Sequence, residues 1–344
     1  MRSFHSLRGY LKKKDVFNRA GLRFSQLVRG RHAFGQPKII QIETTASCNL
    51  KCVMCPHGKD GVFSDGRKAF MTHQEFANVL DKFPKATSVS LQGVGEPMLN
   101  PDLPRIVSEA VRRGMETGFY TNGTLLSSGN CEWILRSGLN WIIVSLDAGT
   151  PEEFKRIRKG ADLNKIMSNL KGLIKAKKEL KARNPSVGIM FVAMPSNVNE
   201  ISSVIDIAVE AGVDWLSIKG CHGGLSSNEK EWAVSEEDFK KLQAAIKTEK
   251  AKALTIHMDS REVDPRIRGP KKSRMKCTWA WEKTYISVDG SACPCCYALP
   301  ELGMSVGNIF TDDFKNIWNN AKYTQFREKI KNEVADVCEK CPLY

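Results

Sequence analysis

Residues 42–59 read IETTASCNLKCVMCPHGK and place three cysteines, Cys48, Cys52 and Cys55, in a C-x3-C-x2-C pattern. The stretch 38–44 (KIIQIET) is rich in β-branched residues, which predicts a strand that ends just before the cysteines. Thiolates are soft ligands suited to iron–sulfur clusters, and four of them normally complete a [4Fe–4S] cube. Three thiolates leave one iron without a protein ligand and therefore open to an exogenous chelate.

A structural zinc site is the alternative interpretation of these cysteines, with His57 as the fourth ligand. The spacing alone leaves both metals open. The position in the chain favours the cluster, because ligand sites in parallel barrels lie on loops at the C-terminal ends of the strands.

Strand-like and helical segments alternate from Pro37 onward. The strand-like runs are 38–44, 87–91, 117–121, 141–146, 187–193 and 213–218, and helical patterns lie near 72–83, 101–113, 126–137, 162–182 and 198–211. Such β-α repeats imply a parallel sheet with right-handed crossovers. Six repeats are too few for a full eight-stranded barrel. We therefore expect an α/β fold with a partial (βα)6 barrel over residues 38–220, and an open doubly wound sheet is the alternative.

Three short motifs lie at or just past the ends of the second, third and fourth predicted strands. They are Gly93-Val94-Gly95-Glu96-Pro97, Thr121-Asn122-Gly123 and Ser145-Leu146-Asp147. Each is weak alone, since Asn-Gly is also a common turn. In this order, after the cysteine loop, they resemble the signature of the radical S-adenosylmethionine (radical SAM) enzymes, whose fold is a six-unit partial barrel.

The resemblance implies a cofactor and a set of residues that hold it. Cys48, Cys52 and Cys55 would bind a [4Fe–4S] cluster whose open iron is chelated by S-adenosylmethionine. Further contacts to S-adenosylmethionine are implied for these residues: Met54 at the adenine, Gly95 and Glu96 at the methionine amino group, Thr121 and Asn122 in the third motif, and Ser145 and Asp147 at the ribose. Relatives often carry an aromatic residue where this chain has Met54.

Six further cysteines lie in residues 277–344: Cys277, Cys293, Cys295, Cys296, Cys338 and Cys341. With the GNI and IW elements that follow Cys296, this stretch resembles the SPASM/twitch accessory domain, a small α+β unit. The resemblance implies one auxiliary [4Fe–4S] cluster on four of the six, namely Cys277, Cys295, Cys338 and Cys341. A zinc ribbon on the same four cysteines is the alternative. Cys293 or Cys296 could replace Cys295, and Cys296 is also a candidate hydrogen-atom donor or a buried spectator.

The positive charge is local. Residues 1–38 contain ten Lys or Arg and one acidic residue, a net charge of +9. Residues 261–276 contain seven Lys or Arg and two acidic residues, a net charge of +5, so the two segments account for the whole net charge of +14. Residues 1–37 form a basic arm with apolar residues at helical spacing, which predicts amphipathic helices that either bind an anionic membrane surface or pack on the barrel. Residues 221–276 are expected to be a connector and linker. The eleven cysteines and the absence of a signal peptide favour the cytoplasm, with the membrane periphery as an additional location.

Family chemistry implies a 5′-deoxyadenosyl radical that abstracts a hydrogen atom from a C–H bond. An auxiliary cluster with four cysteines suits electron acceptance, which predicts an oxidoreductase acting on a carbohydrate-like, lipid-linked or peptide substrate. Flavodoxin or ferredoxin would supply electrons. The alternatives are an epimerase that uses Cys296 as hydrogen donor, an RNA-modifying enzyme, and a non-enzymatic iron–sulfur or zinc protein. The arm lacks an aromatic-rich RNA-recognition pattern, so a nucleic-acid partner is not expected. The non-enzymatic alternative does not explain why Glu96, Asn122 and Ser145 lie at the ends of strands.

Overall fold

One ten-stranded sheet organises the computed structural model, which describes residues 16–55, 67–221, 232–264, 277–300 and 303–332 together with Cys338 and Cys341. The strands are β1 (Ile39–Ile42), β3 (Ser88–Leu91), β4 (Glu116–Thr121), β5 (Trp141–Ser145), β7 (Ser186–Ala193), β8 (Trp215–Gly220), β9 (Thr255–Met258), β10 (Lys283–Ile286), β11 (Ser291–Cys293) and β12 (Gly307–Asn308). Their order is β12-β11-β10-β1-β3-β4-β5-β7-β8-β9, and neighbours from β10 to β9 are parallel. The six predicted barrel strands are therefore confirmed, in chain order.

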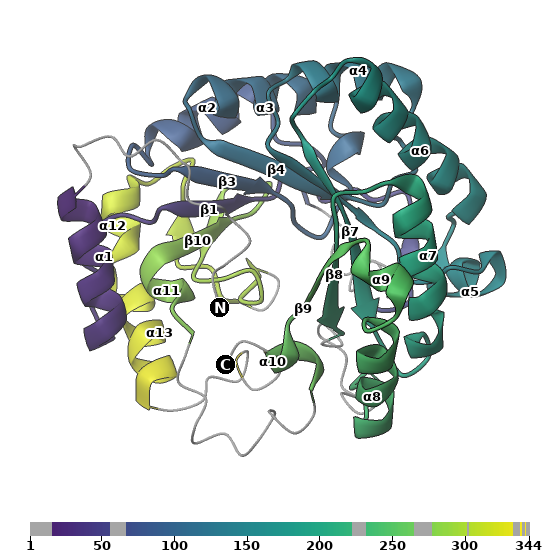
Figure 1. The fold of residues 1–344 in the computed structure, drawn as a ribbon. Helices are drawn as coiled ribbons and strands as arrows, with labels where there is room; N and C mark the ends of the chain where they lie inside the picture. The colour runs from purple at the N-terminus through teal and green to yellow at the C-terminus, as the bar shows by residue number, and fades with distance from the viewer. Residues whose placement is uncertain are drawn as a thin grey trace.

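Helices cover the outer face of this curved sheet (Figure 1). They are α2 (His73–Asp81), α3 (Leu103–Arg112), α4 (Ser128–Arg136), α5 (Pro151–Ile157), α6 (Leu163–Glu179) and α7 (Ile201–Ala211). In α3 the buried residues are Leu103, Ile106, Val107 and Ala110, the spacing that puts one apolar stripe against a sheet. A capping box between Thr72 and Glu75 begins α2.

Aromatic side chains fill the barrel interior where the strands begin. Trp141 opens β5 and Trp215 opens β8, and both belong to an inner cluster with Ile143 and Met190. Glycines on the neighbouring strands make room for the indoles, because a Cβ at Gly118 would lie 2.0 Å from the Trp141 side chain. Bulky side chains therefore occupy this end of the barrel, whereas ligand sites in parallel barrels lie at the opposite edge, where the strands end.

The segment expected to be a connector contributes an additional barrel strand. It contains α8 (Glu236–Ala245), α9 (Glu249–Lys252), β9 and α10 (Ser260–Val263). Strand β9 pairs in parallel with β8, and Ser217 lies opposite His257. The sequence pattern missed β9 because its four residues, TIHM, are exposed or half-buried at the sheet edge and form no apolar run.

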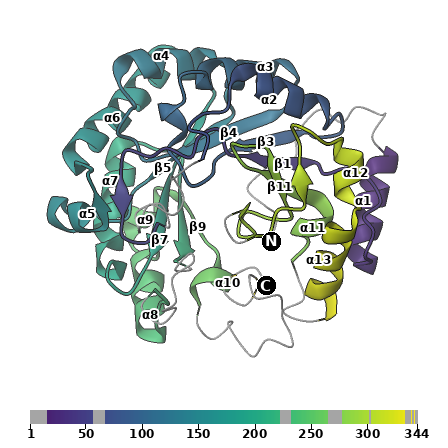
Figure 2. The ribbon, with the colours of Figure 1, turned by 180° about the vertical axis from the view of Figure 1, so that it is seen from behind.

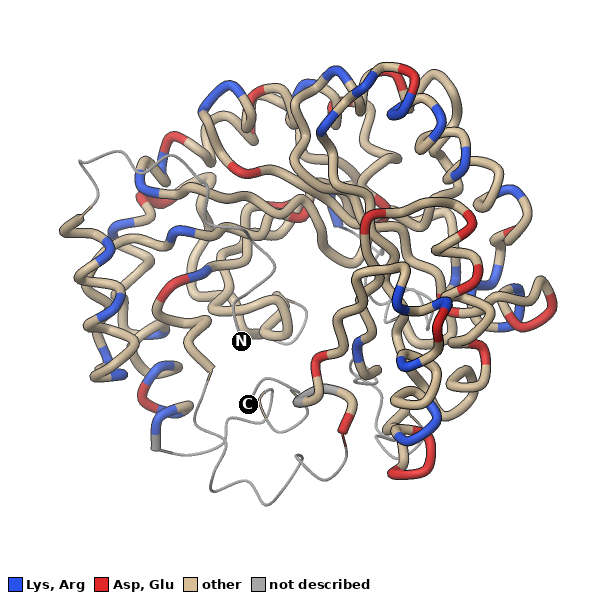
Figure 3. Tube along the Cα trace, viewed as in Figure 1, with Lys and Arg blue, Asp and Glu red and all other residues tan. Residues whose placement is uncertain are grey.

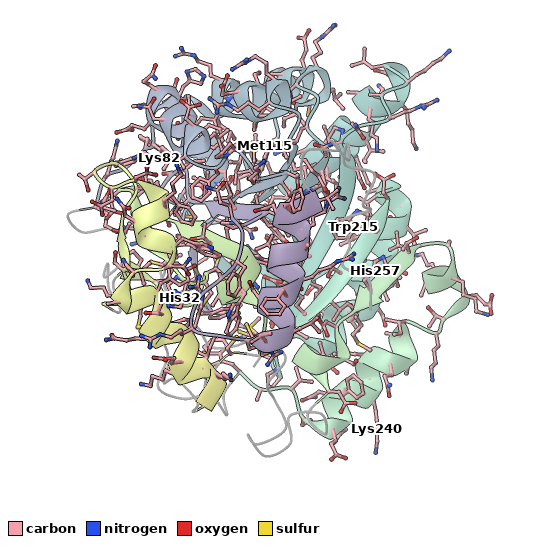
Figure 4. All side chains as sticks on the ribbon, turned by 90° about the vertical axis from the view of Figure 1, so that its left-hand side faces the viewer. His32, Lys82, Met115, Trp215, Lys240 and His257 are labelled. Carbon is pink, nitrogen blue, oxygen red and sulfur yellow. The ribbon has the colours of Figure 1, made fainter. Side chains whose placement is uncertain are left out.

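The C-terminal accessory unit continues the barrel sheet rather than standing beside it. It comprises α11 (Trp279–Glu282), β10, β11, β12, α12 (Phe314–Trp318) and α13 (Ala321–Asn332). Strand β10 pairs in parallel with β1, and Ile40 lies opposite Thr284. Figure 2 shows β11, α11 and α13 gathered at the β1 edge of the barrel. Lys82, which follows the last residue of α2 and is labelled in Figure 4, donates a 2.8 Å hydrogen bond to the carbonyl of Asp312.

Helix α1 (Val16–Val28) packs on the accessory unit, against α11. The indole of Trp281 donates to the carbonyl of Gly30 at 2.8 Å, and that of Trp318 donates to Gly35 at 2.7 Å. The part of the predicted arm before Val16 lies outside the described residues. Among the described helices, none is both long and apolar enough to cross a bilayer.

Candidate active site

The first three cysteines lie together on the loop that follows β1. Cys52 is buried, Cys48 and Cys55 are half-buried, and the amide of Cys55 donates to the carbonyl of Cys52 at 3.1 Å. Burial, with smaller contributions from the charges of Glu96, Cys52 and Cys55, raises the pKa of Cys48 to about 11. Three thiols crowded in this way fit one cluster, which would bind them as thiolates and release their protons.

Glu96 connects the second and third motifs. Its buried carboxylate accepts a 2.7 Å hydrogen bond from the hydroxyl of Thr121 and another of 2.7 Å from the backbone N–H of Asn122. The amide of Met98 adds a third at 3.2 Å. Burial raises the pKa of Glu96, and the bonds from Asn122 and Thr121 oppose that shift. A carboxylate offers about four acceptor positions, so this one retains capacity for the ammonium of a ligand.

Gly95 lets the second motif lie directly against the cysteine loop. A Cβ at Gly95 would lie 2.3 Å from the carbonyl oxygen of Thr45 and 2.6 Å from that of Ser47. The next amide, that of Glu96, donates to the Ser47 carbonyl at 2.8 Å. Only glycine permits this contact, which fixes the distance between Glu96 and the cysteines.

Asn122 is tied to the cysteine loop by its side chain. Its Nδ2 donates to Oδ1 of Asn49 at 2.8 Å, and Nδ2 of Asn49 donates to the hydroxyl of Thr124 at 2.9 Å. Asn49 lies directly after Cys48, so the third motif and the cluster loop hold each other in place. The sequence analysis singled out Asn122 but not Asn49.

Ser145 and Asp147 take different positions at the end of β5. Ser145 is half-buried, whereas the carboxylate of Asp147 is fully buried in an ion pair with Arg158, at 2.6 and 2.7 Å. The other oxygen of Asp147 accepts from the amide of Val192 at 2.8 Å.

Arg158 also reaches the cysteine loop, because its Nη1 lies 3.8 Å from the sulfur of Cys52 as a hydrogen-bond donor. Arg158 belongs to β6 (Arg158–Lys159), which pairs with β2 (Lys51–Cys52) of the cysteine loop. The sequence analysis missed Arg158, because this residue belongs to none of the motifs.

A second buried carboxylate, that of Glu43 at the end of β1, bridges the barrel and the accessory unit. It accepts hydrogen bonds from the amides of Val94 at 3.0 Å and Val288 at 3.1 Å, and it forms an ion pair with Arg67. Glu43 therefore fixes the loop that carries Gly95 and Glu96 relative to β10.

Five of the six C-terminal cysteines line one cavity: Cys277, Cys295, Cys296, Cys338 and Cys341. Trp279, Phe326 and Ile330 complete its apolar wall. Burial raises the pKa of Cys295 to about 11 and also raises the pKa of Cys338. Cys293 instead lies fully buried against Tyr285 and Leu299. All four proposed ligands are thus brought together, and Cys296 is the one additional thiol beside them.

Cys296 lies between this cavity and the cofactor loop. It packs, with Val94 of the second motif, against the cluster of Tyr285, Cys293 and Leu299. Burial raises the pKa of Cys296, whereas the charge of Lys219 at the end of β8 lowers it. The thiol is therefore within electrostatic range of a barrel-lining strand as well as of the cavity.

These donor sets fit the groups that the sequence implies. Cys48, Cys52 and Cys55 offer three thiols beside a buried acceptor, Glu96, which suits a cluster with an open iron and an ammonium-bearing chelate.

Comparisons with known families agree with this geometry. The model of the radical SAM superfamily matches residues 42–208, and the model of the SPASM iron–sulfur cluster-binding domain matches residues 277–342. The chain belongs to the radical SAM superfamily, whose members bind S-adenosylmethionine at a [4Fe–4S] cluster. More narrowly, it is one of the radical SAM enzymes with a C-terminal SPASM domain, which holds auxiliary iron–sulfur clusters.

Two curated relatives cover much of the chain. The tungsten-containing aldehyde ferredoxin oxidoreductase cofactor-modifying protein of Pyrococcus furiosus is 25% identical over 327 residues, which are 89% of this chain and 87% of that protein. A probable GTP 3′,8-cyclase of Sulfurisphaera tokodaii is 30% identical over 233 residues, 66% of this chain and 68% of that protein.

Solved structures share the fold at lower identity. SuiB of Streptococcus suis, bound to its precursor peptide SuiA, has a TM-score of 0.70 and 15% identity over 95% of this chain and 75% of that chain. The enzyme anSMEcpe, with bound S-adenosylmethionine and a peptide, has a TM-score of 0.63 and 18% identity over 88% of this chain and 85% of that chain. These likenesses confirm the predicted architecture of a radical SAM core followed by a SPASM domain.

Proposed function

We propose that this enzyme is a radical SAM oxidoreductase that abstracts a hydrogen atom from a substrate C–H bond. The resulting substrate radical then releases one proton to solvent and passes one electron to an auxiliary cluster. The observation that carries the proposal is the five-cysteine cavity, whose Cys296 packs with Val94 of the cofactor loop against one cluster of side chains. An electron acceptor in this cavity would be linked by this packing to the loop that carries Gly95 and Glu96.

The residues of the chain have separable roles in this proposal. When bound, the first cluster and S-adenosylmethionine supply a 5′-deoxyadenosyl radical. Glu96, held by Thr121 and Asn122, orients the methionine ammonium through a charge-assisted hydrogen bond. Ser145 binds the ribose, and Met54 packs on the adenine. The aromatic layer around Trp141 and Trp215 closes the far end of the barrel, so the substrate enters at the strand C-termini.

The relatives narrow the substrate class. The Pyrococcus relative is named for modifying a cofactor, and both structural neighbours were solved with peptides. We therefore favour a peptide or a cofactor precursor over a carbohydrate-like or lipid-linked substrate. A reduced flavodoxin or ferredoxin would deliver electrons to the first cluster, in the cytoplasm, where eleven cysteines without disulfide bonds stay reduced.

Cys296 favours a second candidate reaction, epimerisation. A thiol beside the cofactor loop could return a hydrogen atom to the substrate radical from the opposite face, leaving no net oxidation. Its position between the cavity and Val94 is the specific observation behind this alternative.

Turnover in deuterated water separates the two reactions. Reconstituted enzyme is incubated anaerobically with S-adenosylmethionine, reductant and candidate peptides or cofactor precursors, and products are analysed by mass spectrometry. Oxidation predicts a product lighter by two hydrogens without solvent deuterium at the attacked carbon, and Cys296→Ala retains it. Epimerisation predicts one deuterium at that carbon, and Cys296→Ala abolishes the product.

Cys293→Ala is the matched control for that variant. Cys293 is also a non-ligand thiol in the accessory unit, but it lies outside the cavity, so its removal should leave either reaction intact. Absence of 5′-deoxyadenosine formation with every peptide and cofactor precursor would argue against the proposed substrate classes.

A further inference from the structure

Exposed apolar side chains are concentrated on one short stretch of the molecule. Seven large hydrophobic side chains are exposed among the described residues, and six of them lie between positions 16 and 34. They are Val16, Phe17, Phe24, Leu27, Val28 and Phe34, with Phe17 exposed by 90% and Leu27 by 83%. The seventh, Leu180, lies at the end of α6, far along the chain. Such clustering differs from the single exposed hydrophobics that are normal on a surface.

The six side chains belong to one outer surface formed by α1 and the turn after it. Phe17, Phe24 and Leu27 are spaced by seven and three residues, which places them on the same side of a helix. The ring of Phe34 meets that of Phe24 edge to face, with centroids 5.3 Å apart. Figure 4 views this face directly, with α1 in front. We call these six residues the α1 outer face.

The opposite side of α1 is fixed to the protein. Leu22 and Ser25 are buried, and the hydroxyl of Ser25 accepts from the amide of Phe34 at 2.7 Å. The side chain of Asn18 both accepts from and donates to the backbone of Gln36, at 2.7 and 3.1 Å. Rotating the helix to bury its outer face would break these bonds. The apolar surface is therefore held outward by the fold.

The charges carried by α1 itself are all positive, although Glu282 and Glu328 of the accessory unit contact Gln26 and Arg31. Helix α1 contains Arg19 and Arg23 and no acidic residue, and Arg29 follows it directly. Figure 3 marks Lys and Arg, but neither Asp nor Glu, along α1. The ten basic residues and one acid of positions 1–38 extend the same imbalance. Apolar side chains bordered by arginines match the headgroup region of an anionic bilayer, where acyl chains and phosphates are adjacent.

We propose that the α1 outer face docks this enzyme on an anionic phospholipid membrane. The charge pattern selects this occupant, because an uncharged apolar groove of a protein partner would leave the arginines without a counterion. Docking places the accessory unit, on which α1 packs, toward the lipid surface. The inference is independent of which reaction the enzyme performs.

The test uses full-length protein with both clusters loaded and sedimentation with vesicles. Vesicles of phosphatidylglycerol and phosphatidylcholine are compared with pure phosphatidylcholine vesicles at low and high salt. Wild-type protein should pellet with the anionic vesicles at low salt and return to solution at high salt. The double substitution Phe17→Asp and Leu27→Asp should lower the vesicle partition coefficient at least tenfold. Arg19→Gln with Arg23→Gln should lower it as well and flatten the salt dependence.

Leu180→Asp is the control, since it removes the exposed leucine that lies outside the α1 outer face, at the end of α6, and should leave partitioning unchanged. Removing the arm is a poor test, because Trp281 and Trp318 donate to carbonyls within it. The proposal is wrong if the wild-type protein does not bind anionic vesicles, if it binds both vesicle types equally, or if the double substitution binds as tightly as wild type. Concentration-dependent dimerisation that is lost in the double substitution, without vesicle binding, would assign the face to a second copy instead.

Discussion

The carboxylate of Glu43 accepts a 3.1 Å hydrogen bond from the amide of Val288, joining the end of the first barrel strand to the SPASM domain. The same carboxylate holds the amide of Val94 in the cofactor loop at 3.0 Å. One buried group therefore fixes three segments that lie far apart in the chain, and the two iron–sulfur sites depend on a shared support.

Replacing Glu43 by alanine should destabilise the whole enzyme. It removes the ion pair with Arg67 and leaves two amides without this acceptor, and breaking a buried pair typically costs about 3–5 kcal/mol. Anaerobic denaturant unfolding followed by tryptophan fluorescence measures the change. Glu132→Ala, which breaks the exposed pair with Arg136, is the control and should have no measurable effect. Equal stability of the two variants would contradict a supporting role for Glu43.

Glu96→Gln should weaken S-adenosylmethionine binding and leave both clusters assembled. The amide keeps an acceptor for Thr121 or Asn122 but loses the charge that pairs with the ligand ammonium, a loss of about ten- to hundredfold in affinity. Equilibrium dialysis under anaerobic conditions measures the affinity, and iron analysis checks the clusters. Unchanged affinity would leave Glu96 as a structural loop residue.

The same binding should depend on pH in wild type and not in Glu96→Gln. Burial raises the pKa of Glu96 above the ordinary glutamate value, so its carboxylate is protonated, and loses its attraction for an ammonium, at a higher pH than usual. Affinity should therefore fall as pH is lowered, by up to about tenfold per pH unit once below that pKa. A wild-type profile as flat as that of the variant between pH 8 and 5 would show that the carboxylate does not titrate there.

Arg158→Gln should alter the first cluster. The variant leaves Asp147 buried without its partner and removes the donor 3.8 Å from the Cys52 sulfur. A cationic hydrogen-bond donor stabilises the reduced cluster, so its loss should lower the reduction potential. A tenfold change in a one-electron equilibrium corresponds to about 59 mV, and we expect a decrease of that order in an EPR-monitored titration. Arg156→Gln, two residues earlier and paired with Glu153 at the surface, is the control.

Gly95→Ala should disrupt the contact between the cofactor loop and the cysteine loop. The added methyl group would lie 2.3 Å from a backbone oxygen that cannot move aside, so both cluster incorporation and S-adenosylmethionine binding should fall. Gly172→Ala in α6 meets nothing within 4 Å and should be neutral or stabilising by up to about 1 kcal/mol. Iron content and thermal midpoints of the two variants test this contrast. If Gly95→Ala behaves like Gly172→Ala in both measurements, the contact does not require glycine.

Local pattern determined most of the catalytic barrel. Strand periodicity located the six central strands, and the order of parallel strands places their C-terminal ends at one edge. The cysteines, Glu96, Asn122 and Ser145 could therefore be expected together before any coordinates, because each follows a strand directly. The spacing of the cysteines left zinc and an iron–sulfur cluster open, and the position of the loop together with the three later motifs indicated the cluster.

Tertiary structure alone decided the partners of distant or polar segments. Four such relationships connect residues whose local sequence gives no periodic signal. They are the pairing of β10 with β1, the pairing of β9 with β8, the ion pair between Asp147 and Arg158, and the hydrogen bonds of Glu43 to distant amides. A buried charge is stable only where a specific partner reaches it, and that partner is set by the folded chain rather than by its neighbours in sequence. For the same reason the amphipathic pattern of the arm predicted a helix but not which side faces outward. Burial of Leu22 and Ser25 against the protein decided that.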